Sequence, residues 1–156
     1  MHQSWKNSLK IYLTKEGMTL LLLGFASGLP LWLYYGTLSI WLKEAGVSNS
    51  SIGFFSLVGI CYSFKWIWAP LPDRLHLPFL TKALGRRRGW IVLTQVGVII
   101  GILGMAFTDP TLNLFQMAIF SVVLAFFSAT QDVVIDAYRI EVGDEESQAG
   151  LAAAYM

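Results

Sequence analysis

Four long apolar stretches constrain this chain more than any other feature. They cover residues 18–41, 51–71, 90–107 and 112–138, and a helix needs about 20 largely apolar residues to cross a bilayer. Hydrophobic residues make up 55% of the chain and charged residues 13%, a balance that excludes an ordinary soluble domain. We therefore predict an all-α integral membrane protein with four transmembrane helices, plus the start of a fifth at about residue 149.

The apolar stretch that begins at Ala149 is too short to cross a membrane before the chain ends at Met156. We expect the chain to be part of a longer protein. The alternative is a complete four-helix protein with a short tail. The expected division is a cytoplasmic segment over residues 1–17, followed by a partial transmembrane bundle over residues 18–156.

Basic residues are distributed unevenly between the two ends of the predicted helices. Lys43 lies at one end and Lys65 inside a helix, and all the others lie at the opposite end: Lys6, Lys10, Lys15, Arg74, Lys82, Arg86, Arg87, Arg88 and Arg139. Short loops rich in Lys and Arg stay on the cytoplasmic side of a membrane. We therefore predict that the N-terminus and the loop over residues 71–89 are cytoplasmic.

Polar side chains recur along one face of the fourth predicted helix. Ser128, Asp132, Asp136 and Arg139 are spaced by four, four and three residues, so they share one helical face, and Gln131 widens it. An acid at the centre of a membrane helix costs about 2.5–3.5 kcal/mol, so this face should contact another helix or water. Alternatively, Asp136 and Arg139, which can pair at this spacing, form the hydrated end of the helix.

Lys65 is a second charged residue inside an apolar stretch. It precedes Leu71 by six residues, which places it about 9 Å from the expected helix end. Its ammonium group could extend to the interface, or it could form an ion pair with Asp132 at a comparable depth. An acid that loses its cation partner at low dielectric takes up a proton more readily. Lys65, Asp132 and Asp136 are therefore our candidates for proton coupling.

The loop between the second and third predicted helices is rich in charge. Pro70 and Pro72 should end the second helix at Leu71. The charged residues on this side of the membrane are Asp73, Arg74, Arg86, Arg87, Arg88 and Arg139. We predict that they gate access to the bundle. The alternative is a basic anchor that binds anionic lipid head groups.

Glycine pairs and a proline indicate how the helices pack. Gly24 with Gly28, and Gly97 with Gly101, form GxxxG patterns, which favour close helix contacts in lipid. Pro30 removes a backbone donor and should kink the first helix.

No residue pattern indicates an enzyme, a cofactor, a metal centre or nucleic-acid binding. His2 and His76 are far apart in sequence, and Cys61 is the only cysteine. The chain has no Walker A motif, dinucleotide-binding loop or Ser/His/Asp set, and its net charge is only +1. We therefore expect a protein that is not an enzyme.

Several segments resemble a known transporter superfamily. Asp73-Arg74 and Gly85-Arg86-Arg87 match the two halves of the loop signature of the major facilitator superfamily, with Ala69 in place of its leading glycine and an insertion at 75–84. A narrower resemblance is to the AmpG-type muropeptide permeases. The segments that carry it are 24–31, 52–59, 64–71, 85–90 and 129–139.

The resemblance implies that the chain is part of the N-terminal half of a bundle of at least twelve helices, completed by the C-terminal half of the same polypeptide. It implies a secondary carrier in the bacterial inner membrane that imports anhydro-muropeptides, which are peptidoglycan fragments, for cell-wall recycling. The expected partners are membrane lipid, this substrate and protons.

Aromatic faces suit sugar rings, and a buried acid suits an amine or a proton. The candidates for the substrate cavity are therefore Trp32, Tyr34, Tyr35, Gln131 and Asp132. The alternatives are an acetyl-CoA-type transporter of the same superfamily, or a non-transporting four-helix membrane protein that binds a partner.

Overall fold

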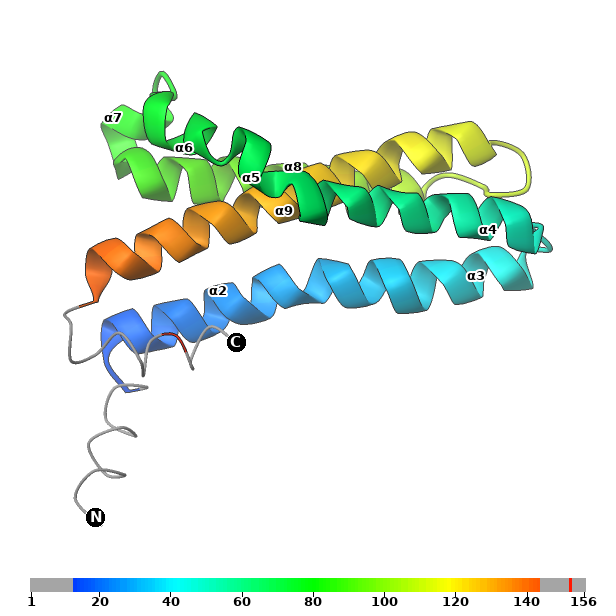
Figure 1. The fold of residues 1–156 in the computed structure, drawn as a ribbon, viewed down its shortest axis with the longest axis horizontal. Helices are drawn as coiled ribbons and strands as arrows, with labels where there is room; N and C mark the ends of the chain where they lie inside the picture. Colours follow the sequence, from blue (N-terminus) through cyan, green and yellow to red (C-terminus); the bar gives the residue numbers. More distant parts are fainter. Residues whose placement is uncertain (1–12, 144–151, 153–156) are drawn as a thin grey trace, which may run out of the picture.

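The computed structural model describes residues 13–143 and residue 152, and this part of the chain is helical without strands (Figure 1). In chain order the elements are α2 (Lys15–Trp32), the π-helix η1 (Leu33–Leu38), α3 (Ser39–Glu44), α4 (Asn49–Ser56), the 3₁₀ turn η2 (Leu57–Gly59), α5 (Ile60–Trp68), α6 (Pro70–Arg74), α7 (Leu80–Leu84), α8 (Arg86–Ala106) and α9 (Leu114–Val142).

Except for the short α7, these elements join into four helices that are long and apolar enough to cross a membrane. They run over Lys15–Glu44, Asn49–Arg74, Arg86–Ala106 and Leu114–Val142. The predicted all-α membrane protein with four spanning helices is thereby confirmed. The predicted fifth helix falls outside the described residues except at Ala152, and so do residues 1–12 of the predicted N-terminal segment.

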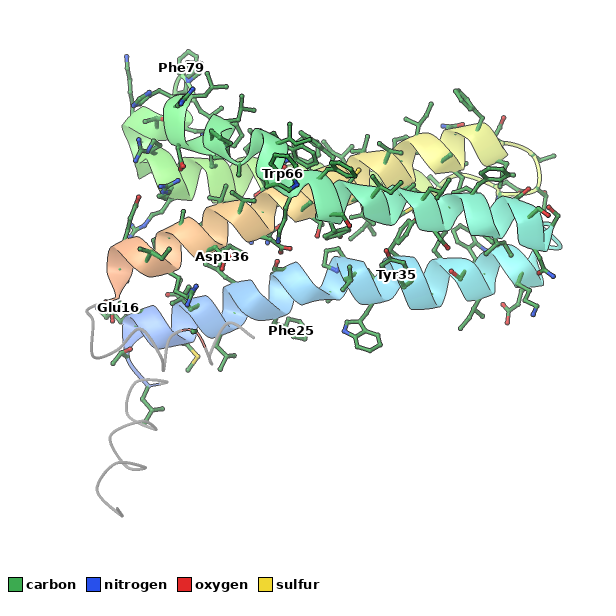
Figure 2. The ribbon with its side chains drawn as sticks, viewed as in Figure 1. Glu16, Phe25, Tyr35, Trp66, Phe79 and Asp136 are labelled. Carbon is green, nitrogen blue, oxygen red and sulfur yellow. The ribbon has the colours of Figure 1, made fainter. Side chains whose placement is uncertain are left out.

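The outer surface of these helices is apolar. Phe25 on α2 and Trp66 on α5 are 71% and 68% exposed, and Phe25 projects away from the bundle (Figure 2). Exposed aromatic side chains at mid-helix suit contact with lipid, or with further helices, rather than with water.

The second helix does not end where its prolines suggested. We expected Pro70 and Pro72 to stop it at Leu71, but α6 continues it to Arg74. α5 ends at Trp68, just before the prolines, and Pro70 stands in the first turn of the short helix α6, a position that proline tolerates because a first-turn backbone N–H has no partner within its own helix. The spanning segment therefore extends beyond Leu71, and the prolines mark the break between α5 and α6 within it.

The first helix departs from α-geometry just after Pro30. α2 runs through Pro30, which is buried, and the departure from α-geometry comes just afterwards in η1. A π-turn inserts an extra residue into a helix and is frequent at functional sites. Here it carries Tyr34 and Tyr35, whose rings meet edge to face with centroids 5.2 Å apart.

Glycines bring α8 and α9 into close contact. A side chain at Gly97 would collide with the Phe127 ring, and one at Gly101 would meet the Leu124 backbone at 2.9 Å. The predicted close contact at Gly97 and Gly101 is confirmed. Gly28 behaves differently, because a Cβ there meets no atom within 4 Å among the described residues.

We expect Gly101→Ala to destabilise the bundle by about 1–3 kcal/mol, because the added methyl group forces two packed helices apart. Denaturant unfolding of the protein in detergent micelles would measure this loss. Gly28→Ala is the matched control, since it adds the same group at a helical position with open space and should be neutral or slightly stabilising. Equal effects of the two substitutions would contradict the packing described here.

Two apolar clusters fill the interior, one towards each end of the bundle. One includes Tyr34, Leu38 and Leu124, and the other includes Leu20 and Val134. In the first membrane helix, Ser27 lies between Leu20 of α2 and Tyr34 of η1, and on α9, Asp132 lies between Leu124 and Val134. The fold therefore leaves a polar layer between its two apolar clusters.

A capped turn joins α8 to α9. Asp109 accepts hydrogen bonds from the backbone N–H of Thr111 at 2.8 Å and from the Thr111 hydroxyl at 2.6 Å. The hydroxyl bond is the main cause that holds the pKa of Asp109 below its usual value. Asp109 therefore stays mostly ionised even when the pH falls to the usual pKa of an aspartate.

Candidate functional site

Asp132 is the centre of the polar layer and joins three helices. Its Oδ2 atom lies 3.3 Å from the Lys65 ammonium of α5. Its Oδ1 atom accepts a hydrogen bond from the Ser27 hydroxyl of α2. Each carboxylate oxygen of Asp132 thus has a partner on a different helix.

The helix periods explain this meeting. Ser27 is 6% exposed and lies on the face of the first membrane helix that carries the buried Leu20 of α2 and Tyr34 of η1, each seven residues away. Seven residues are about two helical turns, so the three side chains share a face. Lys65 lies near the end of α5, where its ammonium group turns towards Asp132. It forms the predicted ion pair instead of extending alone to the interface.

The pair is partly accessible rather than sealed. The Lys65 and Asp132 side chains are 34% and 19% exposed in the described bundle. Opposite charges interact more strongly here than at a hydrated surface because the two side chains are largely removed from water. Partial access also allows a proton or a polar ligand to reach the carboxylate, and a fully buried pair would not allow that.

Hydroxyl groups surround this pair. Tyr62 precedes Lys65 by three residues on α5, and Ser128 precedes Asp132 by four residues on α9, so both hydroxyl side chains lie one helical turn from the ion pair. The Trp68 indole donates a hydrogen bond to the Thr130 hydroxyl at 3.1 Å. In the described residues, the interface between α5 and α9 is therefore lined with polar groups at the level of Asp132.

The predicted cavity residues lie in three different environments. Tyr35 is 48% exposed and extends from η1 towards the second helix, where its hydroxyl occupies the space beside Gly59 (Figure 2). Tyr34 is buried in the apolar cluster beside it. Trp32 is 78% exposed and does not join the polar layer.

Gln131 is only 1% exposed and has no hydrogen-bond partner for its amide among the described residues. It is four residues beyond Phe127, which packs on Gly97 of α8, and so lies on the α8-facing side of α9. Of the predicted cavity residues, Tyr35 and Asp132 are therefore those that line an accessible polar region.

Asp136 and Arg139 lie further along α9. Asp136 projects from α9 on the side of α2 (Figure 2), and its Oδ1 atom is 3.7 Å from an Arg139 nitrogen. The Asp136 side chain is 46% exposed. This geometry is typical of a hydrated helix end, and it separates Asp136 from the contacts of Asp132.

A charged cluster closes the end of the bundle beyond Arg139. We give this name to Asp73, Arg86, Arg87 and Glu141. Arg87 is its centre, because its guanidinium pairs with the Asp73 carboxylate and donates a hydrogen bond to Glu141 at 2.8 Å. Arg86 donates to the backbone oxygen of Asp73 at 2.9 Å. The cluster links the second, third and fourth helices.

The arginines of this cluster begin α8 rather than lie in the preceding loop as predicted. Gly85 caps the helix with a φ of 84°, a conformation that glycine adopts at little cost. Positive charge at a helix N-terminus is unfavourable, and the carboxylates of Asp73 and Glu141 offset it. The ion pairs in the described residues do not include Arg74 or Arg88.

We expect Arg87→Ala to lower the free energy of unfolding by about 1–2 kcal/mol, because it breaks two charged contacts of a side chain that is only 13% exposed. Arg88→Ala is the control, since it removes the same charge one residue away. Unfolding in micelles at low and high salt would test this. A loss that is the same for both variants would show that general positive charge, rather than these contacts, stabilises this end.

Three side chains of these sites escaped the sequence analysis: Ser27, Tyr62 and Glu141. Each belongs to a residue type that is common in such helices, so no local pattern marks it. Their importance follows from which helices are neighbours. The position of Ser27, seven residues from both Leu20 and Tyr34, becomes a signal only when α2 is known to lie against α9.

Comparisons with known proteins agree with a transporter. The family model described as acetyl-coenzyme A transporter 1 matches residues 17–155. The chain is 47% identical over 145 residues to a protein of Escherichia coli (strain K12) named anhydromuropeptide permease, covering 92% of this chain and 29% of that relative. The names permease and transporter agree with the prediction that the protein is not an enzyme.

Two relatives from Rickettsia carry related names. The chain is 34% identical over 139 residues to putative transporter AmpG 4 of Rickettsia felis, covering 89% of this chain and 33% of the relative. It is 41% identical over 132 residues to putative transporter AmpG 3 of Rickettsia prowazekii, covering 85% and 30%. The chain thus spans about a third of the length of these relatives. It is a multi-pass membrane protein and belongs to the acetyl-coenzyme A transporter 1 family.

Proposed function

We propose that this chain is part of a secondary carrier that imports anhydro-muropeptides across the bacterial inner membrane for cell-wall recycling, driven by the proton gradient. The relative with 47% identity, named anhydromuropeptide permease, supports the substrate. The observation that carries the mechanism is the partly accessible ion pair between Lys65 and Asp132 within the spanning helices. Buried charge in such helices marks substrate and proton pathways.

The proposed coupling step is a proton exchange at Asp132. When a proton binds Asp132, the carboxyl group becomes neutral and no longer attracts the Lys65 ammonium group. The second helix then loses its electrostatic link to the fourth, so the two can separate as the carrier changes its open side. Loss of the proton restores the pair. Ser27 holds the carboxylate in place in the paired state.

Tyr35 is our candidate for sugar contact, because it is half exposed at the level where η1 faces the second helix. Trp32, Tyr34 and Gln131 remain proposed cavity residues. Trp32 is exposed in the described bundle, so it would line a cavity only where the rest of the protein packs against this helix. We propose that the remaining length of the polypeptide supplies the opposite wall of the cavity. The charged cluster would lie on the cytoplasmic side, together with the N-terminus, and would gate that side.

Uptake of a labelled anhydro-muropeptide by cells that express the full-length gene product tests this proposal. We expect accumulation that collapses when a protonophore removes the gradient. Accumulation that survives the protonophore would reject proton coupling. Absence of uptake by a correctly inserted protein would reject the substrate.

A second candidate is transport of acetyl-coenzyme A, which the description of the matching family favours. Unlabelled acetyl-coenzyme A as a competitor distinguishes the two, since it should leave muropeptide uptake unchanged if the first proposal holds. Strong competition, or direct uptake of labelled acetyl-coenzyme A, would favour the second candidate.

A further inference from the structure

Several hydroxyl groups lie inside the bundle on one side of Asp132. The Tyr34 hydroxyl and the Ser128 hydroxyl are buried and have no hydrogen-bond partner among the described residues. Tyr62 precedes Lys65 by three residues on α5, and Ser128 precedes Asp132 by four residues on α9, so both lie one helical turn from the ion pair. A buried hydroxyl without a partner is costly, and such groups in proteins are usually satisfied by internal water.

Tyr62 connects these hydroxyls to the carboxylate. It precedes Lys65 by three residues on α5, so it lies one helical turn from the contact between Lys65 and Asp132. It also follows Gly59 by three residues, and the Tyr35 hydroxyl lies beside Gly59 while the Tyr35 ring contacts the Tyr34 ring. Ser128 precedes Asp132 by four residues on α9, so their side chains share a face about 6 Å apart along the helix. A few waters among these groups could therefore form a continuous hydrogen-bonded chain.

The hydroxyls and the ion pair lie on different sides of Asp132. Ser128 is displaced from Asp132 towards the start of α9, and Tyr62 is displaced from Lys65 towards the start of α5. Both displacements lead away from the charged cluster, because Asp73 of the cluster follows the C-terminal end of α5 and Glu141 lies at the C-terminal end of α9. The groups that face Asp132 are Ser27 from α2, and Lys65 and Tyr62 from α5.

We propose that Tyr62 and Ser128, with water held between them and Tyr34, carry protons to Asp132 from the end of the bundle opposite to the charged cluster. This inference rests on the proposed proton coupling and names its route. The two hydroxyls are positioning and relay groups, and Asp132 is the group that keeps the proton.

The chemistry of each step is a proton hop. A water or hydroxyl in the chain donates its proton to the next oxygen and receives one from the preceding water. The last donor transfers a proton to an Asp132 oxygen, so one O–H bond breaks for each that forms. No hydroxyl gains or loses a net proton, and the carboxylate alone changes charge.

The test uses Tyr62→Phe and Ser128→Ala in the full-length protein, with Tyr138→Phe as the matched control. Tyr138 also lies on a spanning helix but packs against the cluster around Leu20, away from Asp132. Two uptake modes are measured. One is gradient-driven accumulation of labelled muropeptide, and the other is counterflow, in which labelled and unlabelled substrate exchange without net proton movement.

We expect Tyr62→Phe to slow gradient-driven uptake about tenfold or more and to leave counterflow near the unaltered rate. Ser128→Ala should act in the same direction. Retained counterflow shows that the variant folds and binds substrate, so a slow gradient-driven rate then reports proton delivery. The final accumulation level should be preserved, because a relay changes a rate and not the equilibrium.

Gradient-driven uptake at the unaltered rate in both variants would overturn the relay. Equal losses in the rate of gradient-driven uptake and in the rate of counterflow would also overturn it, since they indicate a structural or substrate-binding role. These outcomes are separate from failure of the proposed function. That failure would appear as gradient-independent uptake in the unaltered protein.

Discussion

Asp132→Asn should abolish gradient-driven accumulation while counterflow persists. The amide keeps the shape of the carboxyl group and can still accept a hydrogen bond from Ser27, but it cannot exchange a proton or pair with the Lys65 charge. A gradient of about 100 mV stores about 2.3 kcal/mol for each charge. The accumulation ratio should therefore fall by roughly fifty-fold per coupled proton at that potential, to the level set by the substrate gradient alone.

The measurement compares the steady-state accumulation ratio of labelled muropeptide in cells that express Asp132→Asn or the unaltered full-length protein. Asp136→Asn is the matched control. Asp136 also lies on α9, but its side chain is 46% exposed and pairs with Arg139 in a hydrated setting. Accumulation by Asp132→Asn that remains sensitive to a protonophore would remove Asp132 from the coupling step. A larger loss in Asp136→Asn would transfer the role to that residue.

Lys65→Met should destabilise the bundle and alter the transport cycle. Methionine retains an apolar stem of similar length but leaves the Asp132 carboxylate without its cation. Breaking one partner of a fully buried pair costs about 3–5 kcal/mol. Because Lys65 and Asp132 are 34% and 19% exposed, we expect a smaller loss of about 1–3 kcal/mol.

A double-mutant cycle separates this effect from general loss of packing. We expect Lys65→Met combined with Asp132→Asn to be more stable than the sum of the two single losses, because the double variant buries no unpaired charge. Lys43→Met is the control for charge removal, since Lys43 lies in the last turn of α3 and takes no part in the ion pair with Asp132. If the two single losses simply add in the double variant, the contact at 3.3 Å contributes nothing to stability.

The four membrane helices follow from the sequence alone. Apolar stretches of bilayer length must satisfy their backbone hydrogen bonds within themselves, and in lipid an isolated stretch can do this only as a helix. The helix ends were less predictable. Pro70 and Pro72 suggested an end at Leu71, but Pro70 begins the short helix α6, which carries the spanning segment on to Arg74, because proline is tolerated in the first turn of a helix.

The sequence also singled out Asp132 and Lys65, the two charged residues of the ion pair, since they stand out against apolar neighbours. The sequence alone does not show that the two side chains are in contact. Their contact depends on how each helix is rotated about its axis and on which helices lie beside it. The packing of α8 on α9 through Gly97 and Gly101 sets part of the rotation of α9.

Only the tertiary structure, therefore, selected Ser27 and Tyr62 as neighbours of Asp132 and left Trp32 exposed. Serine, tyrosine and tryptophan are ordinary residues of membrane helices, and their local sequence does not distinguish a site from a surface. The cost of burying charge in lipid determines that a polar site must exist, whereas the contacts between distant helices determine which side chains form it.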